Sequence, residues 1–272
     1  MRIGISNIAW DPAEDDLVAE LLQAHRVDAI DIAPGKYFSD PRQVSDAEID
    51  AVSKWWRDRQ IEITGMQGLL FGTQGLNLFG DETAREAMLQ TLVAICRIAG
   101  RLEAPRLVFG SPANRDRSGL DDQEALTRAT EFLGRLGDAA EAHGVFVCLE
   151  PVPECYGSNF MRNSAETAQV VRRVDHPAIR LQLDAGALAI NGESPVETVA
   201  AVAPWVGHVH ASEPELKTLG DGNADHAGLG AALRSHLPDH LVTIEMRASA
   251  QEPHLEAIDR ALKVAQRHYG HS

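Results

Sequence analysis

Eight short apolar runs alternate with longer amphipathic segments along the whole chain, and this alternation restricts the fold more than any other feature. Continuous β-branched and aromatic runs of this length are typical of strands buried on both faces. Strands that alternate with helices form a parallel sheet, and eight such units in 272 residues predict a closed barrel. We therefore predict an α/β protein with a single domain, a (β/α)8 or TIM barrel over residues 1–272.

The expected strands are 2–8, 27–33, 61–66, 106–110, 145–150, 179–184, 206–210 and 241–245. The expected helices are 12–25, 46–59, one that ends near 101, 121–143, one that begins near 164, 194–202, 225–237 and 253–268. A doubly wound open sheet is the main alternative. It is disfavoured because the first strand runs into Ser6-Asn7-Ile8-Ala9-Trp10, which lacks the glycine-rich turn of dinucleotide-binding folds.

Charge and composition restrict the class of partner. The formal net charge is −15, and such a surface repels both nucleic acid and anionic lipid. No apolar run approaches the ~20 residues of a membrane span. Residues 1–7 enter a strand at once, which gives no sign of a signal peptide. Three scattered cysteines, Cys96, Cys148 and Cys155, favour a reducing compartment, so we expect a cytoplasmic protein. The sequence leaves open both a monomer and a homo-oligomer.

Each of the last four expected strands ends in a side chain that can bind a metal ion: Glu150, Asp184, His210 and Glu245. The carboxyl ends of barrel strands meet at one face, where the active sites of such barrels lie. Three carboxylates and one imidazole suit Mn²⁺, Mg²⁺ or Co²⁺, and Zn²⁺ also accepts these ligands. Without a cation, a buried cluster of three carboxylates is costly. The pattern therefore predicts one bound divalent ion.

A single acidic residue at a strand end more often caps a helix or forms a loop ion pair. Four such residues at the same point of successive units favour a shared site. His208 points to the same side as His210, and we expect it to be a hydrogen-bonded core histidine. We expect Cys148 to fill core space, and His143 and His226 to lie on solvated helix surfaces.

Five short motifs stand at or near the ends of the last four expected strands: Leu149-Glu150-Pro151, Gln182-Leu183-Asp184-Ala185-Gly186, His208-Val209-His210-Ala211-Ser212-Glu213, Ile244-Glu245-Met246 and the turn Gly220-Asp221-Gly222-Asn223-Ala224-Asp225. With these motifs the chain resembles the xylose isomerase-like TIM barrels. It is most similar there to the sugar phosphate isomerase/epimerase group, which includes the ketose 3-epimerases. The resemblance spans the whole chain in length and order.

The resemblance implies a divalent-metal-dependent sugar isomerase or epimerase. Glu150 and Glu245 would form an acid/base pair as well as bind the metal, while Asp184 and His210 mainly hold it. One glutamate removes a proton α to a carbonyl, the metal stabilises the enediolate, and the other glutamate returns a proton from the opposite face. The alternatives are a dehydratase of a keto-sugar or keto-inositol, and a non-catalytic sugar-binding barrel. An endonuclease acting at abasic sites is disfavoured by the net charge.

The substrate-binding residues depart from the epimerase pattern. Many of the epimerases carry a histidine three residues after the strand-six aspartate, where this chain has Ala187. Arg247 is two positions after Glu245, so in a continued strand it would point to the same side and face the site. Its guanidinium would suit a phosphate or carboxylate on the substrate. Trp10, Phe71 and Phe79 are candidates for an apolar wall, with core packing as the equal alternative. The candidate contacts to a carbohydrate are Tyr156, Asn159, Glu213, Lys217 and Arg247.

Overall fold

The computed structural model describes residues 1–270 and forms a closed barrel of parallel strands in sequence order. The last strand pairs with the first, with Ile3 beside Val242 and Ile5 beside Ile244. The prediction of a (β/α)8 barrel is thus confirmed. The strands are β1 (Ile3–Ser6), β2 (Ala29–Ile32), β3 (Glu62–Met66), β4 (Arg106–Phe109), β5 (Phe146–Leu149), β6 (Ile179–Asp184), β7 (Val206–Ser212) and β8 (Val242–Glu245).

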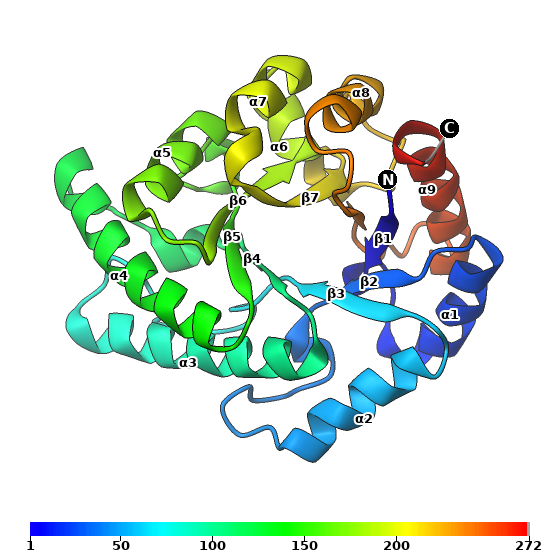
Figure 1. Cartoon of the computed structure of the whole chain (residues 1–272), viewed down its shortest axis with the longest axis horizontal. Helices are drawn as coiled ribbons and strands as arrows, with labels where there is room; N and C mark the ends of the chain where they lie inside the picture. The colour runs from blue at the N-terminus through cyan, green and yellow to red at the C-terminus, as the bar shows by residue number, and fades with distance from the viewer. Residues whose placement is uncertain (271–272) are drawn as a thin grey trace.

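The helices surround the barrel as an outer ring (Figure 1). Most of the helices begin with a side-chain cap, in which an oxygen of the N-cap residue accepts from a free backbone N–H group. In one example Ser45 accepts from the N–H of Glu48, which in turn reaches back to Ser45. The helices are α1 (Asp15–Ala24), α2 (Asp46–Arg57), α3 (Glu82–Leu102), α4 (Asp122–Ala142), α5 (Ser164–Val174), α6 (Ala185–Asn191), α7 (Pro195–Val202), α8 (His226–His236) and α9 (His254–Tyr269).

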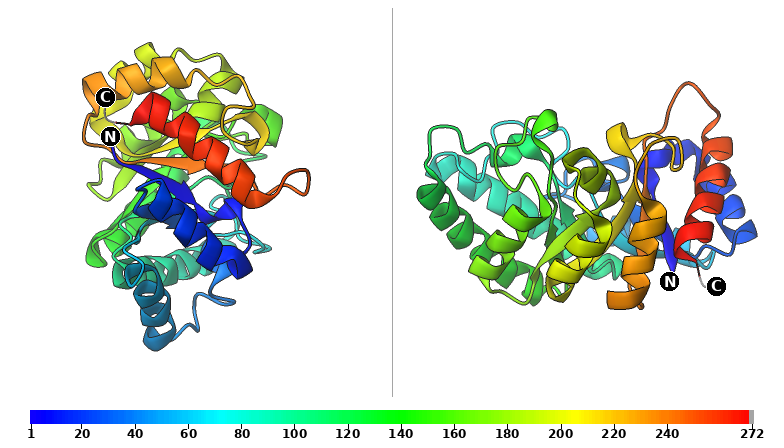
Figure 2. Two further views of the ribbon diagram at one scale, coloured as in Figure 1. Left: turned by 90° about the vertical axis from the view of Figure 1, so that its right-hand side faces the viewer. Right: turned by 90° about the horizontal axis from the view of Figure 1, so that it is seen from above.

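The start of β1 and the end of α9 lie side by side (Figures 1 and 2). The amino group of Met1 donates a hydrogen bond to the carbonyl of Tyr269 at 3.1 Å. The first and last βα units therefore close the ring directly. Among the described residues, no helix combines the length and the apolar character that a membrane crossing needs.

Two local differences from the sequence expectations bear on the carboxyl face of the barrel. Helix α6 begins directly after β6 and was not expected; Asp184 caps it by accepting from the N–H of Ala187 at 2.6 Å. Strand β7 continues two residues beyond His210, as far as Ser212, so that Ser212 lies beside Glu245 of β8. These changes add a helix N-terminus and a hydroxyl group at the strand ends.

The residues expected to fill the core or to form an apolar wall of the pocket are not equally buried. Cys148 is fully buried, as expected for a core filler. Trp10 is fully buried and packs edge-on against Trp56, with ring centroids 6.4 Å apart. Phe79 is buried against Phe160. Trp10 and Phe79 therefore serve as packing anchors, whereas Phe71 in the loop after β3 is 91% exposed.

Candidate metal and catalytic site

The side chains of Glu150, Asp184, His210 and Glu245 converge at the carboxyl end of the barrel. Each offers one ligand atom, and these atoms all lie within 4.8 Å of one another. His210 Nδ1 lies 3.2 Å from Glu245 Oε2 and 3.6 Å from Glu150 Oε1. The structure therefore brings together the four residues that the strand-end pattern singled out, although they come from four different βα units.

The donor set fits a divalent cation. The His210 ring is fully buried, yet neither of its nitrogens has a hydrogen-bond partner among the described residues. A buried polar group without a partner is costly, and so is a group of buried carboxylates. An ion among the four side chains would satisfy the imidazole and neutralise the carboxylates with its preferred oxygen and nitrogen ligands.

Without an ion, the cluster holds protons. Burial, and then the charges of Glu245 and Glu150, raise the pKa of Asp184 to about 7. Burial also raises the pKa of Glu150. Burial opposes the charged form of His210, but the two glutamates outweigh it and lift the pKa of His210 well above its usual value. A cation that enters the cluster must displace these protons.

Residues outside the cluster hold its carboxylates in place, and the sequence analysis missed them. Ser212 donates to Asp184 Oδ2 at 2.6 Å, and Gln67 donates to Glu245 Oε1 at 2.6 Å. Burial would raise the pKa of Glu245, but His210 and this Gln67 hydrogen bond lower it. Gln67 directly follows β3, so the strand-end pattern that identified the four ligands could have found it as well.

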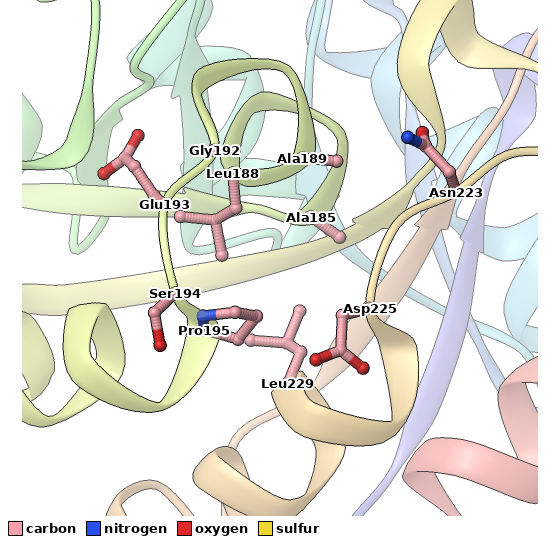
Figure 3. Close-up of a pocket in the computed structure, with 10 residues that line it drawn as sticks. All are labelled: Ala185, Leu188, Ala189, Gly192, Glu193, Ser194, Pro195, Asn223, Asp225 and Leu229. Atoms are coloured by element: carbon pink, nitrogen blue, oxygen red, sulfur yellow. The ribbon is translucent and has the colours of Figure 1, made fainter.

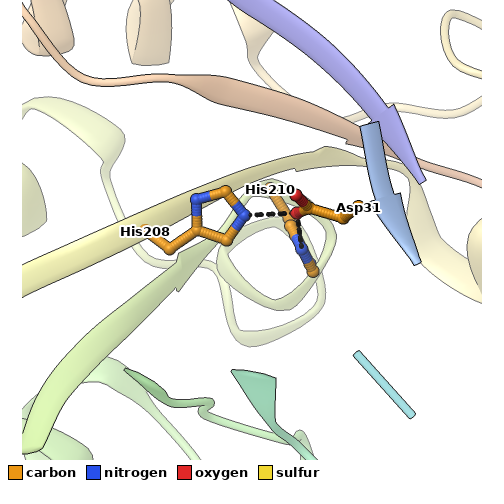
Figure 4. A group of neighbouring side chains, drawn as sticks. All are labelled: Asp31, His208 and His210. Carbon is orange, nitrogen blue, oxygen red and sulfur yellow. Dashed lines mark hydrogen bonds and ion pairs between the residues drawn. The ribbon is translucent and has the colours of Figure 1, made fainter. Parts of the chain in front are cut away.

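Asp31 of β2 is a further buried carboxylate that the sequence analysis did not single out. Its Oδ2 lies 2.6 Å from His208 Nε2 (Figure 4). Its Oδ1 accepts from the Thr64 hydroxyl at 2.9 Å. His208 is therefore the hydrogen-bonded core histidine that was expected. In the sequence, Asp31 is the single charged residue within the apolar run of β2, and this feature could have identified it.

A family comparison agrees with this geometry. The model of the xylose isomerase-like TIM barrel family matches residues 19–268, almost the whole chain. The chain belongs to this family. The family assignment confirms the resemblance that the strand-end motifs indicated, and it places the four-residue cluster within a xylose isomerase-like barrel.

Two curated proteins with similar sequences are epimerases. A D-psicose 3-epimerase from Ruminiclostridium cellulolyticum is 29% identical over 115 residues, which cover 42% of this chain and 39% of that protein. An L-ribulose 3-epimerase from Methylomonas sp. is 29% identical over 157 residues, which cover 57% of this chain and 51% of that protein. The matches thus span about two fifths to one half of the length of these relatives.

Solved structures extend the likeness of the fold to the whole chain. A D-psicose 3-epimerase from Clostridium cellulolyticum H10, determined with D-tagatose, has a TM-score of 0.83. The superposition covers 99% of both chains at 18% sequence identity. At this identity the comparison establishes a shared barrel fold.

Three of the candidate substrate contacts from the sequence, Tyr156, Lys217 and Arg247, are exposed in the loops at the carboxyl ends of the strands. Tyr156 is 43% exposed, and its hydroxyl accepts from the N–H of Glu215 at 2.7 Å, which joins the loop after β5 to the loop after β7. Lys217 is exposed and pairs with Glu215 at 3.1 Å. Arg247 is exposed as well, and its backbone N–H donates to the carbonyl of Leu216. Strand β8 ends at Glu245, so the alternation used to orient Arg247 stops before it reaches that residue.

Asn159 is occupied by contacts within the protein. Its side-chain NH2 group donates to Asp116 Oδ1 at 2.6 Å, and its side-chain oxygen accepts from the N–H of Arg117 at 3.0 Å. These bonds tie the loop after β5 to the loop after β4. Substrate binding by Asn159, like that by Tyr156, Lys217 and Arg247, stays a prediction.

Glu213 organises the loop after β7 from a buried position. Its carboxylate accepts from the N–H groups of Gly220 and Ala224 and faces His226 Nε2, each at 3.0 Å. The other nitrogen of His226 lies 2.6 Å from the hydroxyl of buried Tyr269. The expectation of a solvated His226 is therefore wrong: α9 covers the first turn of α8 and buries this ring. Both oxygens of Glu213 are used by the protein's own donors.

A cavity of about 260 Å³ lies between α6, α7 and the start of α8 (Figure 3). Leu188, Pro195 and Leu229 form its apolar part, and Asn223 and Asp225 contribute polar groups. None of the four cluster residues lines it. The cavity is thus separate from the cluster.

Proposed function

We propose that this protein is a divalent-metal-dependent sugar isomerase or epimerase that transfers a proton at the carbon α to a carbonyl group. The observation that carries the proposal is the convergence of Glu150, Asp184, His210 and Glu245 within 4.8 Å at the ends of successive strands. The names of the relatives, D-psicose 3-epimerase and L-ribulose 3-epimerase, support the same type of reaction on a small carbohydrate.

The arrangement of the strands assigns a role to each side chain. Glu150, Asp184, His210 and Glu245 would hold a divalent ion, which would supply a positive charge to polarise the carbonyl and to stabilise negative charge on the substrate oxygens. Glu150 follows β5 and Glu245 ends β8, which are not neighbours in the barrel, so their carboxylates reach a ligand from different sides. One glutamate takes the α proton and the other returns a proton to the opposite face. Asp184, fixed by Ser212, holds the ion together with His210.

Conservative variants test these roles. Glu150→Gln and Glu245→Gln keep the side-chain shape but remove the base, and each should lower kcat by at least the ~10²-fold typical of positioned proton transfer. Glu154→Gln is a matched control, because Glu154 is an exposed glutamate in the same loop as Glu150. Bound metal is measured for every variant, so that loss of the ion is separated from loss of the base. Turnover that survives complete chelation would contradict the proposal.

The products separate the proposal from its main alternative. The same proton abstraction can expel a β-hydroxyl group, which would make the enzyme a dehydratase of a keto-sugar or keto-inositol. An epimer or isomer supports the proposal, whereas an unsaturated or deoxy product with loss of water supports the dehydratase. Product analysis by NMR distinguishes them for any sugar that is turned over.

The replacement of histidine by Ala187 bears on the substrate. Ala187 is buried in the first turn of α6, where its N–H binds Asp184. We infer a substrate other than a free ketohexose, so D-psicose and D-fructose should be poor substrates. Ala187→His should not produce strong ketohexose epimerase activity, because a ketohexose site would also need matching contacts from the loops that carry Tyr156 and Lys217. High activity of the unmodified protein on either sugar would contradict this inference.

Two finer assignments belong to the same proposal. The oxygen-rich donor set favours Mn²⁺, with Co²⁺, Mg²⁺ and Zn²⁺ as alternatives, and metal analysis of the protein purified without added metal tests this order.

Cys96, Cys148 and Cys155 are all free thiols. Unpaired cysteines support a reducing, cytoplasmic location, which fractionation of the source cells tests.

A further inference from the structure

Asp31 occupies a site that the barrel has shaped for a carboxylate. It is fully buried, and its partners are the Thr64 hydroxyl at 2.9 Å and His208 Nε2 at 2.6 Å. The neighbouring strand contributes Gly65, where a Cβ atom would lie 2.7 Å from Asp31 Oδ1. Any other residue at this position would crowd the carboxylate. Burying a charged carboxylate is costly, so the presence of Asp31 in this position, with space left for it by Gly65, needs an explanation.

The His210 ring lies between Asp31 and the proposed metal ligands. Its Nδ1 faces Glu245 and Glu150, at 3.2 and 3.6 Å. Its Nε2 faces Asp31 Oδ2 at 4.0 Å (Figure 4). No described residue makes a hydrogen bond to either nitrogen of this ring. The two nitrogens are thus set in different surroundings, one toward the cluster and one toward Asp31.

A neutral imidazole carries its single proton on one nitrogen and a lone pair on the other. The carboxylate of Asp31 attracts an N–H bond and repels a lone pair. At 4.0 Å the separation exceeds that of a hydrogen bond, so the carboxylate acts through its charge, which is poorly screened in the buried interior. The tautomer with the proton on Nε2 is therefore favoured, and it leaves the Nδ1 lone pair directed at the cluster.

We propose that Asp31 is a positioning residue that keeps the proton of His210 on Nε2, so that Nδ1 is the atom that binds the ion. This inference rests on the proposed function, because it assumes that the cluster binds a metal. His208 and Thr64 hold the Asp31 carboxylate in place and act on His210 only through it. Outer carboxylates that orient a metal-binding histidine are worth roughly 10–100-fold in metal affinity.

The first test uses the unmodified protein loaded with Zn²⁺, which is diamagnetic. Long-range ¹H–¹⁵N spectra distinguish a protonated, a metal-bound and a free imidazole nitrogen, and His210→Gln assigns the signals. We expect His210 to carry its proton on Nε2 and the metal on Nδ1. If the metal is on Nε2 and the proton on Nδ1, the proposal is wrong. This test needs no Asp31 variant, so its result does not depend on whether such a variant folds.

The second test compares the Mn²⁺ affinity of Asp31→Asn with that of the unmodified protein and of Thr243→Val. Thr243 lies beside His210 in the barrel and has a buried hydroxyl with no partner among the described residues, which makes it a matched control. We expect Asp31→Asn to bind Mn²⁺ roughly 10–100-fold more weakly while it remains folded, and Thr243→Val to bind it within about twofold of the parent.

The outcomes separate the two proposals. If the parent binds no divalent ion, the proposed function fails and the Asp31 inference fails with it. If the parent binds the ion and folded Asp31→Asn binds it equally well, the Asp31 inference alone is wrong. A second Mn²⁺ per chain that is lost in Asp31→Asn would also overturn the inference, because Asp31, His208 and His210 would then bind an ion themselves.

Discussion

Gly110 provides the space that the Glu150 carboxylate occupies. A Cβ atom at this position would lie 1.7 Å from Glu150 Oε2 and 2.9 Å from its Cδ. In Gly110→Ala the oxygen must therefore retreat by about 1.7 Å to reach the 3.4 Å of ordinary van der Waals contact. A misplacement of about 1 Å at a reacting group can cost ~10²-fold in rate, which is roughly 2.7 kcal/mol of activation free energy.

We expect Gly110→Ala to lower kcat by about 10²-fold or more. The free energy of unfolding should change little, because the atoms that give way belong to the end of a flexible side chain. Steady-state kinetics, metal titration and urea unfolding measure the three quantities. Gly35→Ala is the control, because a Cβ atom there meets nothing within 4 Å. Normal kcat and metal affinity in Gly110→Ala would refute this account of the Glu150 position.

The remaining predictions concern the partners and protons of the site. Gln67→Met leaves a buried oxygen of Glu245 without its donor, and it should lower the free energy of unfolding of the ion-free protein by about 1–3 kcal/mol, measured by urea unfolding; no loss would contradict this role. Since Asp184 has a pKa of about 7 and that of His210 is raised, a cation must displace protons. Metal affinity should therefore fall as the pH drops below 7, and calorimetry in buffers of different ionisation enthalpy should detect proton release; affinity independent of pH would contradict it. Burial opposes ionisation of Glu213, but hydrogen bonds to its carboxylate lower its pKa. Its stabilisation should be present above the ordinary pKa of about 4.3 and lost as the pH falls through the lower folded value. Glu213→Gln should therefore lower Tm at pH 7 and lower it by progressively less as the pH falls below about 4; a Tm difference that does not change with pH would contradict this.

The barrel and the four cluster residues could be predicted because both depend on local sequence. Buried parallel strands require continuous apolar runs, and a glutamate, aspartate or histidine at the end of such a run interrupts the pattern visibly. Glu150, Asp184, His210 and Glu245 all carry this signal. The closed sheet then brings them together without further information from the loops.

The supporting residues could not be recognised in the same way, because their roles arise only when distant segments meet. Asp31 matters because closure of the barrel brings β2 within contact distance, across the interior, of His208 and His210 on β7. The burial of His226 depends on α9, whose Tyr269 lies 43 positions away. The bond from Tyr156 to Glu215 depends on the paths of two loops, and short-range sequence patterns do not determine such paths.

Solvent isotope incorporation is the most direct test of the central claim, which is proton transfer by Glu150 and Glu245 in a metal-dependent site. The protein is incubated in D₂O with divalent metal and a panel that includes L-ribulose, D-psicose and phosphorylated ketoses, and the products are analysed by NMR and mass spectrometry. The account predicts that each product molecule carries deuterium at the carbon α to the carbonyl, and that Glu150→Gln and Glu245→Gln abolish the labelling. Turnover of a sugar with that carbon unlabelled, as a hydride shift between neighbouring carbons would give, would contradict the account.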